Sequence, residues 1–497
     1  VDDIINAATF LCLQMEKPKL IFRPILKNNS MSKLYVFGIG GTGARVLKSL
    51  SFLLAAGVKC KSTSVVPILI DPDAANGDVN KTVDILQRYK SIRSKLSFDG
   101  ESSNQFFKTE ISPLNPNFRI NIQDSKKKFK EFIDFQDLDK KNKALISLLF
   151  SKKNLNADLE VGFKGNPNMG SVVLNQFNTS KDFEDFASSF SQGDKIFIIS
   201  SIFGGTGAAG FPLLLKNIRS ASHNLNNHAL LRSAPVGAVS VLPYFGVKKD
   251  DDSDIEKSTF ISKTKAALRY YEYGVNESVN SMYYLGDKLV KDYENHEGSV
   301  AQQNDAHFIE LASALAVLDF ANDSDGTMNK VKEFGVENEA QTLTFTDLAD
   351  GTKTDLLKPL SKYYFFHLYL KNQLRNNLEA DFAKKLKIKE PFLNEDFYQK
   401  LSRFNEYFWE WLQQMSGNQR GFAPFTLNPQ DDVFNNIKGL KAHKSLIGIN
   451  RLKNYERVTA GLNKTAKKMN TSESTEDRFM EVFYDTTDDL MADKYKL

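Results

Sequence analysis

The pentapeptide GGTGA occurs twice in this chain, at residues 40–44 and 204–208. Each copy follows an apolar run typical of a buried strand and precedes a run typical of a helix. A glycine turn in that position presents backbone N–H groups, lets a ligand approach closely and lies at the positive end of a helix dipole. Both copies therefore predict a binding site for an anion such as phosphate.

The surroundings of the two copies narrow the choice of phosphate ligand. The first copy fits GxGxxG through Gly38, Gly40 and Gly43, and Asp71 follows the next strand, as in a Rossmann dinucleotide site. That interpretation leaves the second copy and a third glycine loop, GFKGNPNMG at 162–170, unexplained. One triphosphate held from two sides explains the repetition. No GxxxxGK[ST] segment occurs, which excludes a Walker-type P-loop.

Alternating strands and helices must position these turns. Strands are predicted at 33–39, 64–73, 194–203, 235–245 and 280–287, and helices at 44–57, 212–222, 262–274 and 397–415. Apolar strands separated by helices are typical of a mostly parallel sheet covered by helices on both faces. The expected fold class is therefore α/β.

The chain divides by composition into three parts. Residues 1–30 are interpreted as an N-terminal arm or a non-native leader, because a strand follows Met31 almost at once. A nucleotide-binding domain is expected at 31–320, with a helical, lysine-rich insertion at about 76–160, and a helix-rich region at 321–497. In that last region a stripe with helical spacing is expected to face the core: Phe397, Leu401, Phe404, Phe408, Trp411 and Met415.

Composition excludes several classes of protein. The net charge of the 497 residues is +4, with basic and acidic residues interspersed, so charge gives no support for nucleic-acid binding. Two cysteines and six scattered histidines predict neither a disulfide framework nor a zinc site. No apolar run reaches about 18 residues, so no membrane-spanning helix is expected. A reducing, cytoplasmic location fits these features.

Six segments, taken in order, resemble the tubulin/FtsZ superfamily and especially its divergent bacterial tubulin-like members. FGIGGTGARV resembles the first phosphate loop, ILIDPDAANGD the loop after strand two, GFKGNPNMG the GAGANPxxG loop, and FIISSIFGGTGAAGFP the GGGTGTG loop. YLGDKL resembles the end of strand six, and QQNDAHFIELASALA the start of the central helix. The resemblance covers roughly residues 33–320 and implies a tubulin/FtsZ-like GTPase domain.

The resemblance also implies a ligand, GTP or GDP with Mg²⁺, and roles for the matching residues. Asp71 would lie by the phosphates or a Mg²⁺ water, although it can instead cap a turn. Asn304 would reach the base, although it can instead be a helix N-cap. A side chain at Gly205 is expected to occupy the phosphate position. The full set of implied nucleotide-binding residues is Gly40, Gly41, Thr42, Gly43, Asp71, Gly165, Asn166, Gly204, Gly205, Thr206, Gly207 and Asn304.

One position departs from the family's pattern. Gly286 stands where FtsZ has an asparagine that contacts guanine, so a preference for guanine follows from the family and not from this residue.

Proteins of this superfamily associate head-to-tail, and acidic residues of the next subunit complete the site for hydrolysis. The nearest match to their NxDxxD motif is FTDLAD at 345–350, which keeps Asp347 and Asp350 as candidate catalytic residues but has Phe345 in place of asparagine. Asp347 can instead be exposed at a strand end.

Two other functions remain open. The helical C-terminal third does not match FtsZ, which favours a nucleotide-sensing subunit that binds a partner protein in a larger bacterial assembly, for antiviral defence or DNA segregation. The third hypothesis is a Rossmann-type dinucleotide enzyme.

Overall fold

The computed structural model describes residues 32–98, 102–163, 165–247, 257–287, 292–293, 304–323, 341–418, 420–427, 433–443, 454–469 and 473–497. The segment interpreted as an N-terminal arm or leader, 1–30, lies outside the described residues.

Six strands form one sheet in which every neighbouring pair is parallel, in the order β3-β2-β1-β4-β5-β7. They are β1 (Lys33–Ile39), β2 (Ser64–Ile70), β3 (Glu110–Ile111), β4 (Lys195–Ser201), β5 (Val236–Val241) and β7 (Ser281–Leu285). The strand order reverses between β1 and β4. Open parallel sheets bind ligands at such a switch point, outside the carboxyl ends of the strands.

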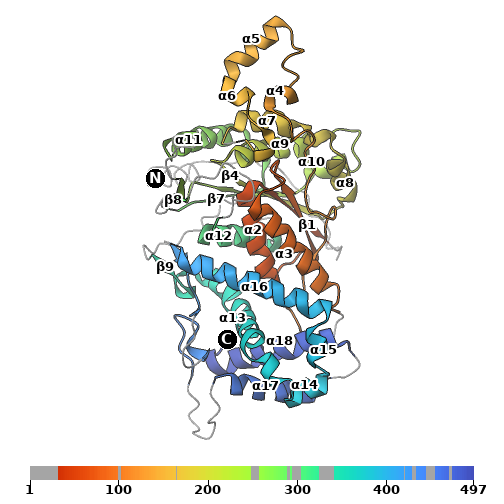
Figure 1. Ribbon diagram of the computed structural model, residues 1–497, viewed down its shortest axis with the longest axis vertical. Coiled ribbons are helices and arrows are strands. Elements are labelled where there is room, and N and C mark those ends of the chain that lie inside the picture. The colour runs from red at the N-terminus through yellow and green to blue at the C-terminus, as the bar shows by residue number, and fades with distance from the viewer. Residues whose placement is uncertain are drawn as a thin grey trace.

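Helices cover both faces of this sheet (Figure 1). One face carries α2 (Gly40–Ala55), α3 (Gly77–Arg93) and α12 (Phe308–Asn322), and the other α7 (Pro167–Leu174), α8 (Lys181–Ser189), α9 (Gly205–Arg219), α10 (His228–Ser233) and α11 (Lys257–Gly274). Side chains of β1 alternate accordingly. Tyr35 and Phe37 each lie 5.1 Å from the ring of Phe186 on α8, whereas Gly38 faces Leu47 of α2. Burial on both faces explains why these strands are apolar throughout.

The insertion is shorter than the sequence predicted. Helix α3 packs against α2, and β3 extends the sheet, so residues from 76 to about 120 belong to the body of the nucleotide domain. The segment that contains α4 (Phe129–Phe132), α5 (Lys140–Leu149) and α6 (Lys152–Leu155), residues 124–161, is called the lobe below, and these helices project away from that body (Figure 1).

The C-terminal region is rich in helices, as predicted. They are α13 (Asp350–Asn372), α14 (Asp381–Leu386), α15 (Glu390–Leu393), α16 (Asp396–Gly417), α17 (Asn454–Lys468) and α18 (Thr475–Tyr495). All six residues of the predicted stripe on α16 are buried. Trp411 packs on Phe52 of α2 and donates its indole N–H to Ser49 Oγ at 3.0 Å, so α16 joins this region to the nucleotide domain. The predicted fold class is confirmed.

Short strand pairs lie outside the main sheet. They are β6 (Gly246–Val247) with β8 (Asp292–Tyr293), and β9 (Thr342–Leu343) with β10 (Gly421–Phe422). Among the described residues, no helix is both long and apolar enough to cross a membrane.

Buried His367 makes stability depend on pH. Its ring stacks on Trp409 at 5.1 Å, and neither ring nitrogen has a hydrogen-bond partner within the described residues. Burial, helped by Lys371, lowers the pKa of His367 from 6.5 to about 3. The unfolded chain therefore binds a proton below about pH 6.5 that the folded chain excludes. Stability is fully present above pH 6.5 and falls with decreasing pH by up to about 1.4 kcal/mol per unit.

We expect His367→Phe to flatten this pH dependence, because it keeps an aromatic stack and removes the titrating group. Urea unfolding at pH 7 and pH 5 measures the effect, and His443→Phe, at an exposed position, is the control. Identical pH slopes for the parent and His367→Phe would contradict the assignment.

Candidate functional site

The two copies of GGTGA lie side by side at the carboxyl ends of β1 and β4. The two strands pair in parallel, with Gly38 opposite Ile199. A Cβ atom built on Gly40 would lie 3.6 Å from Thr206 Cβ and 3.9 Å from the backbone nitrogen of Gly207. Because the first copy opens α2 and the second opens α9, two helix N-termini converge on one place from opposite faces of the sheet.

The last glycine of each copy is needed for packing between strand and helix. A Cβ atom on Gly43 would lie 2.5 Å from the carbonyl carbon of Gly38, and one on Gly207 would lie 2.6 Å from the carbonyl oxygen of Ser201. Neither position accepts a side chain without moving the backbone. These two glycines hold each helix N-terminus tightly against its strand.

The two copies share a sequence but differ in conformation. Gly40 has a φ of +73°, which L-residues rarely adopt, and α2 begins at this residue. Gly204 has a φ of −82° and is the N-cap of α9, which begins one residue later at Gly205. Only the first copy therefore needs glycine at its first position for backbone conformation.

The third glycine loop packs against the second. A Cβ atom on Gly205 would lie 3.1 Å from the backbone nitrogens of both Gly165 and Asn166. A side chain at Gly205 would therefore point at the third loop, and the expectation that it would occupy the phosphate position stays a prediction. Asn166 caps α7, its Oδ1 accepting the N–H groups of the next turn, and Lys263 Nζ donates to the Gly165 carbonyl at 2.6 Å.

Asp71 is linked to the first turn through Asn76. Its Oδ1 accepts the N–H of Asp73 at 3.0 Å, so it caps a turn, and its Oδ2 accepts the amide of Asn76 at 3.3 Å. That amide lies 3.7 Å from the Cβ position of Gly41. Burial raises the pKa of Asp71 to about 7, and the charge of Asp73 adds to the effect.

Asn304 also lies beside the first turn. Its backbone N–H donates to Asp78 Oδ2 at 3.4 Å, and that oxygen is 3.9 Å from the Cβ position of Gly41. The alternative that Asn304 is a helix N-cap is wrong. His307 is the N-cap of α12, in a capping box with Glu310.

Asp347 and Asp350 lie on the segment that leads into α13. Asp347 Oδ2 accepts the N–H and the hydroxyl of Thr344, at 2.7 and 2.9 Å, and so caps the short turn η5 (Phe345–Asp347). Asp350 is exposed at the start of α13. Phe345, which replaces the family's asparagine, is fully buried.

The segment that carries these acids lies near the N-terminal end of α12. The ring of Phe345 lies 5.8 Å from that of Phe422, which in turn lies 5.7 Å from the ring of Phe308. The opposite end of α12 lies at the amino-terminal edge of the sheet, where the amide of Asn322 bonds the backbone of Lys59 and Lys61.

Sequence reasoning missed Arg45, which follows the first GGTGA directly. Its side chain is 2% exposed and lies within 2.6 Å of Asp78, 2.5 Å of Glu310 and 2.9 Å of the Tyr244 hydroxyl. Tyr244 also donates to Glu310 at 3.0 Å. These partners come from α3, α12 and the end of β5. A charged residue directly after the glycine turn, in a mostly apolar helix, was the available signal.

The buried carboxylates keep Arg45 charged. Although burial opposes its charge, Tyr244, Glu310 and Asp78 raise the pKa of Arg45 well above its ordinary value. Lys48 is also buried on α2, and burial lowers its pKa although both carboxylates oppose that change. Arg45 and the two carboxylates thus bind α2, α3 and α12 together beneath the first turn.

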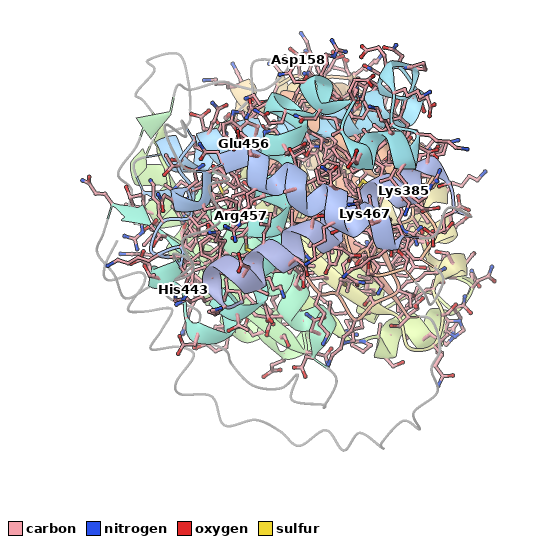
Figure 2. The ribbon with its side chains drawn as sticks, turned by 90° about the horizontal axis from the view of Figure 1, so that it is seen from below. Asp158, Lys385, His443, Glu456, Arg457 and Lys467 are labelled. Atoms are coloured by element: carbon pink, nitrogen blue, oxygen red, sulfur yellow. The ribbon has the colours of Figure 1, made fainter. Side chains whose placement is uncertain are left out.

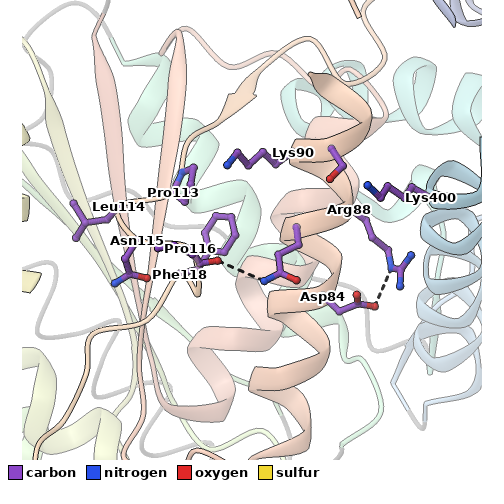
Figure 3. Close-up of a pocket in the computed structure, with 11 residues that line it drawn as sticks. Asp84, Arg88, Lys90, Pro113, Leu114, Asn115, Pro116, Phe118 and Lys400 are labelled. Atoms are coloured by element: carbon purple, nitrogen blue, oxygen red, sulfur yellow. Dashed lines mark hydrogen bonds and ion pairs between the residues drawn. The ribbon is translucent and has the colours of Figure 1, made fainter. Parts of the chain in front are cut away.

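A separate pocket of about 540 Å³ contains no residue of the glycine loops (Figure 3). It lies between α3, the chain after β3 and Lys400 of α16. Arg88 pairs with Asp84 at 2.9 Å, and the amide of Gln87 donates to the Pro116 carbonyl at 3.5 Å. Among the described residues, no group of three or more His, Cys, Asp or Glu side chains is arranged to hold a metal ion.

No protein-family model and no curated protein sequence matches the chain. It is similar in structure to CetZ2 from Haloferax volcanii in a GTPγS-bound protofilament, with 14% identity, a TM-score of 0.29 and 58% of each chain covered. CetZ1 from the same organism, a GDP-bound monomer, has 13% sequence identity and a TM-score of 0.27, with 51% of each chain covered. CetZ from Methanosaeta thermophila strain DSM 6194 has 16% identity and a TM-score of 0.23, with 59% of this chain and 52% of that chain covered.

The chain thus spans little more than half the length of the structures it matches. These similarities have TM-scores below 0.5, so it is the chain's own loops and contacts that support a nucleotide site.

Arg45→Met is expected to destabilise the fold by about 3–5 kcal/mol, because it leaves Asp78 and Glu310 buried without their cation. Urea unfolding measures the loss. The control is Arg88→Met, at a partly exposed ion pair with Asp84, where the expected loss is below about 1 kcal/mol. Small, equal losses in both variants would show that Arg45 does not hold the helices together.

Proposed function

We propose that the chain binds one purine nucleoside triphosphate, GTP, where its three glycine loops meet. The position of Gly40 beside Thr206, together with that of Gly205 beside Gly165 and Asn166, carries the proposal. Two helix N-termini and a third loop then offer backbone N–H groups to one polyphosphate. A dinucleotide site needs only the first of these turns, so the Rossmann alternative leaves the other two contacts without a purpose.

Each loop has a role in this proposal. Gly40–Gly43 holds the α- and β-phosphates, Gly204–Gly207 surrounds the phosphate tail, and Gly165 with Asn166 lies by the γ-phosphate. Lys263 brings positive charge to the third loop through its bond to the Gly165 carbonyl. Asp71, with a pKa of about 7, would be ionised by a bound Mg²⁺ and would hold one of its waters.

The base preference rests on the family resemblance and on Asn304. A Cβ atom on Gly286 would lie 2.9 Å from Leu242 Cβ, so this position has no room for the asparagine of FtsZ. Asn304 lies beside Asp78 at the start of the central helix and is the remaining candidate for contact with guanine.

Gly41→Ala is expected to weaken GTP binding at least about tenfold, which corresponds to about 1.4 kcal/mol. Its Cβ atom would meet Arg45, Asn76 and Asp78 at 3.5–3.9 Å, which is ordinary contact, so the fold tolerates the change. The methyl group instead obstructs close approach of phosphate to the turn. Calorimetric titration with GTP measures the affinity.

Gly351→Ala is the matched control, because no atom lies within 4 Å of its Cβ position on α13. Equal affinity of the parent and both variants would place the ligand elsewhere.

We further propose that subunits stack head-to-tail and that the contact promotes hydrolysis. A partner stacked along the strand direction presents the amino-terminal edge of its sheet to the glycine loops. In this chain Asp323, after α12, lies at that edge, with its carbonyl oxygen 2.7 Å from Lys195 Nζ. Asp347 and Asp350 lie toward the other end of α12, so the geometry favours Asp323 as the acid supplied in trans.

The GTPase rate is expected to rise more steeply than protein concentration, because the active site is completed by a second subunit. Asp323→Asn should lower the maximal rate at least about tenfold without weakening GTP binding. Asp350→Asn is the comparison, and a loss confined to that variant would restore Asp350 as the catalytic acid. Phosphate release measured over about a hundredfold range of protein concentration gives the rate order. A specific activity that stays constant would favour the non-polymerising nucleotide switch.

A further inference from the structure

The lobe has a small core of its own. The rings of Phe129 and Phe150 lie 4.9 Å apart, and Leu155 and Leu159 of the lobe are also buried. Two backbone bonds close its base, from Phe129 N–H to the Ala157 carbonyl at 2.9 Å and from Leu159 N–H to the Lys127 carbonyl at 3.1 Å. The lobe is therefore ordered by residues outside the exposed face of α5.

Helix α5 leaves three leucines in solvent. Leu145, Leu148 and Leu149 are 53%, 85% and 61% exposed, and α5 has no buried residue. Their spacing of three and four residues puts them on one face of the helix. A contiguous exposed apolar face of this kind marks an interaction surface.

The charge of α5 and its neighbouring residues indicates what kind of partner this face binds. Residues 140–153 contain no acidic residue and five lysines: Lys140, Lys141, Lys143, Lys152 and Lys153. Two copies of α5 placed face to face would bring like charges together, which disfavours a second copy through this helix. The lysines that flank the leucines instead require an anionic surface.

We propose that α5 docks on the surface of an anionic phospholipid bilayer, with its leucine face in the interface and its lysines among the headgroups. Basic amphipathic helices bind membranes in this way. Each lysine near an anionic surface adds about 1 kcal/mol. The lobe projects from the body (Figure 1), so α5 reaches a flat surface without obstruction by the rest of the fold. The proposal does not depend on nucleotide binding.

Sedimentation with vesicles tests the proposal. The full chain is expected to bind vesicles of phosphatidylcholine with about one-third phosphatidylglycerol, to lose that binding in high salt, and not to bind phosphatidylcholine alone. The triple variant Leu145→Gln/Leu148→Gln/Leu149→Gln should bind at least tenfold more weakly. All three side chains are more than half exposed, so it should fold as the parent does, which circular dichroism checks.

Lys385→Gln/Lys467→Gln removes two positive charges at the opposite end of the molecule (Figure 2) and is expected to bind as the parent does. Equal binding by the leucine variant and the parent, or no binding to anionic vesicles at low salt, overturns the proposal. Binding to polyglutamate but not to these vesicles would identify an acidic protein as the partner instead. A self-association that only the leucine variant loses would identify a second copy.

Discussion

The parallel pairing of β1 with β4 is the constraint on which the site depends. It brings two glycine turns that are distant in the chain to within ordinary contact, and it aims the N-termini of α2 and α9 at one point. Unsatisfied N–H groups and two positive dipole ends then face each other, an arrangement that an anion relieves. Gly43 and Gly207 hold each helix N-terminus against its own strand, because a side chain there would push the helix away.

The cluster around Arg45 connects this site to the rest of the molecule. Arg45 lies directly after the first turn, and its partners Asp78 and Glu310 belong to α3 and to the central helix α12. One turn further along α2, Ser49 accepts a hydrogen bond from Trp411 of the C-terminal helices. The first turn is therefore connected through a buried ion-pair cluster to α3 and α12, and through Ser49 to the C-terminal helices.

The sequence predicted what is encoded locally. Strand β1 was predicted with its observed bounds, and the buried stripe of α16 was predicted residue by residue, because apolar periodicity alone specifies both. Features that depend on tertiary contact were missed. The bonds of Arg45 reach 33 residues to Asp78 and 265 residues to Glu310. The position of Gly205 against the third glycine loop is a tertiary contact that no local sequence pattern predicts. The insertion was predicted to be too long, because the sequences of α3 and β3 resemble solvent-exposed segments. In the structure β3 belongs to the sheet, and α3 packs between α2 and α16.

Hydrogen exchange measured by mass spectrometry, with and without GTP, tests most directly whether three loops hold one ligand. The account predicts that saturating GTP slows amide exchange together in peptides covering residues 38–46, 162–170 and 203–210, while the lobe helix α5 is unchanged. Protection confined to the first of these peptides, or produced by a dinucleotide and not by GTP, would contradict the account.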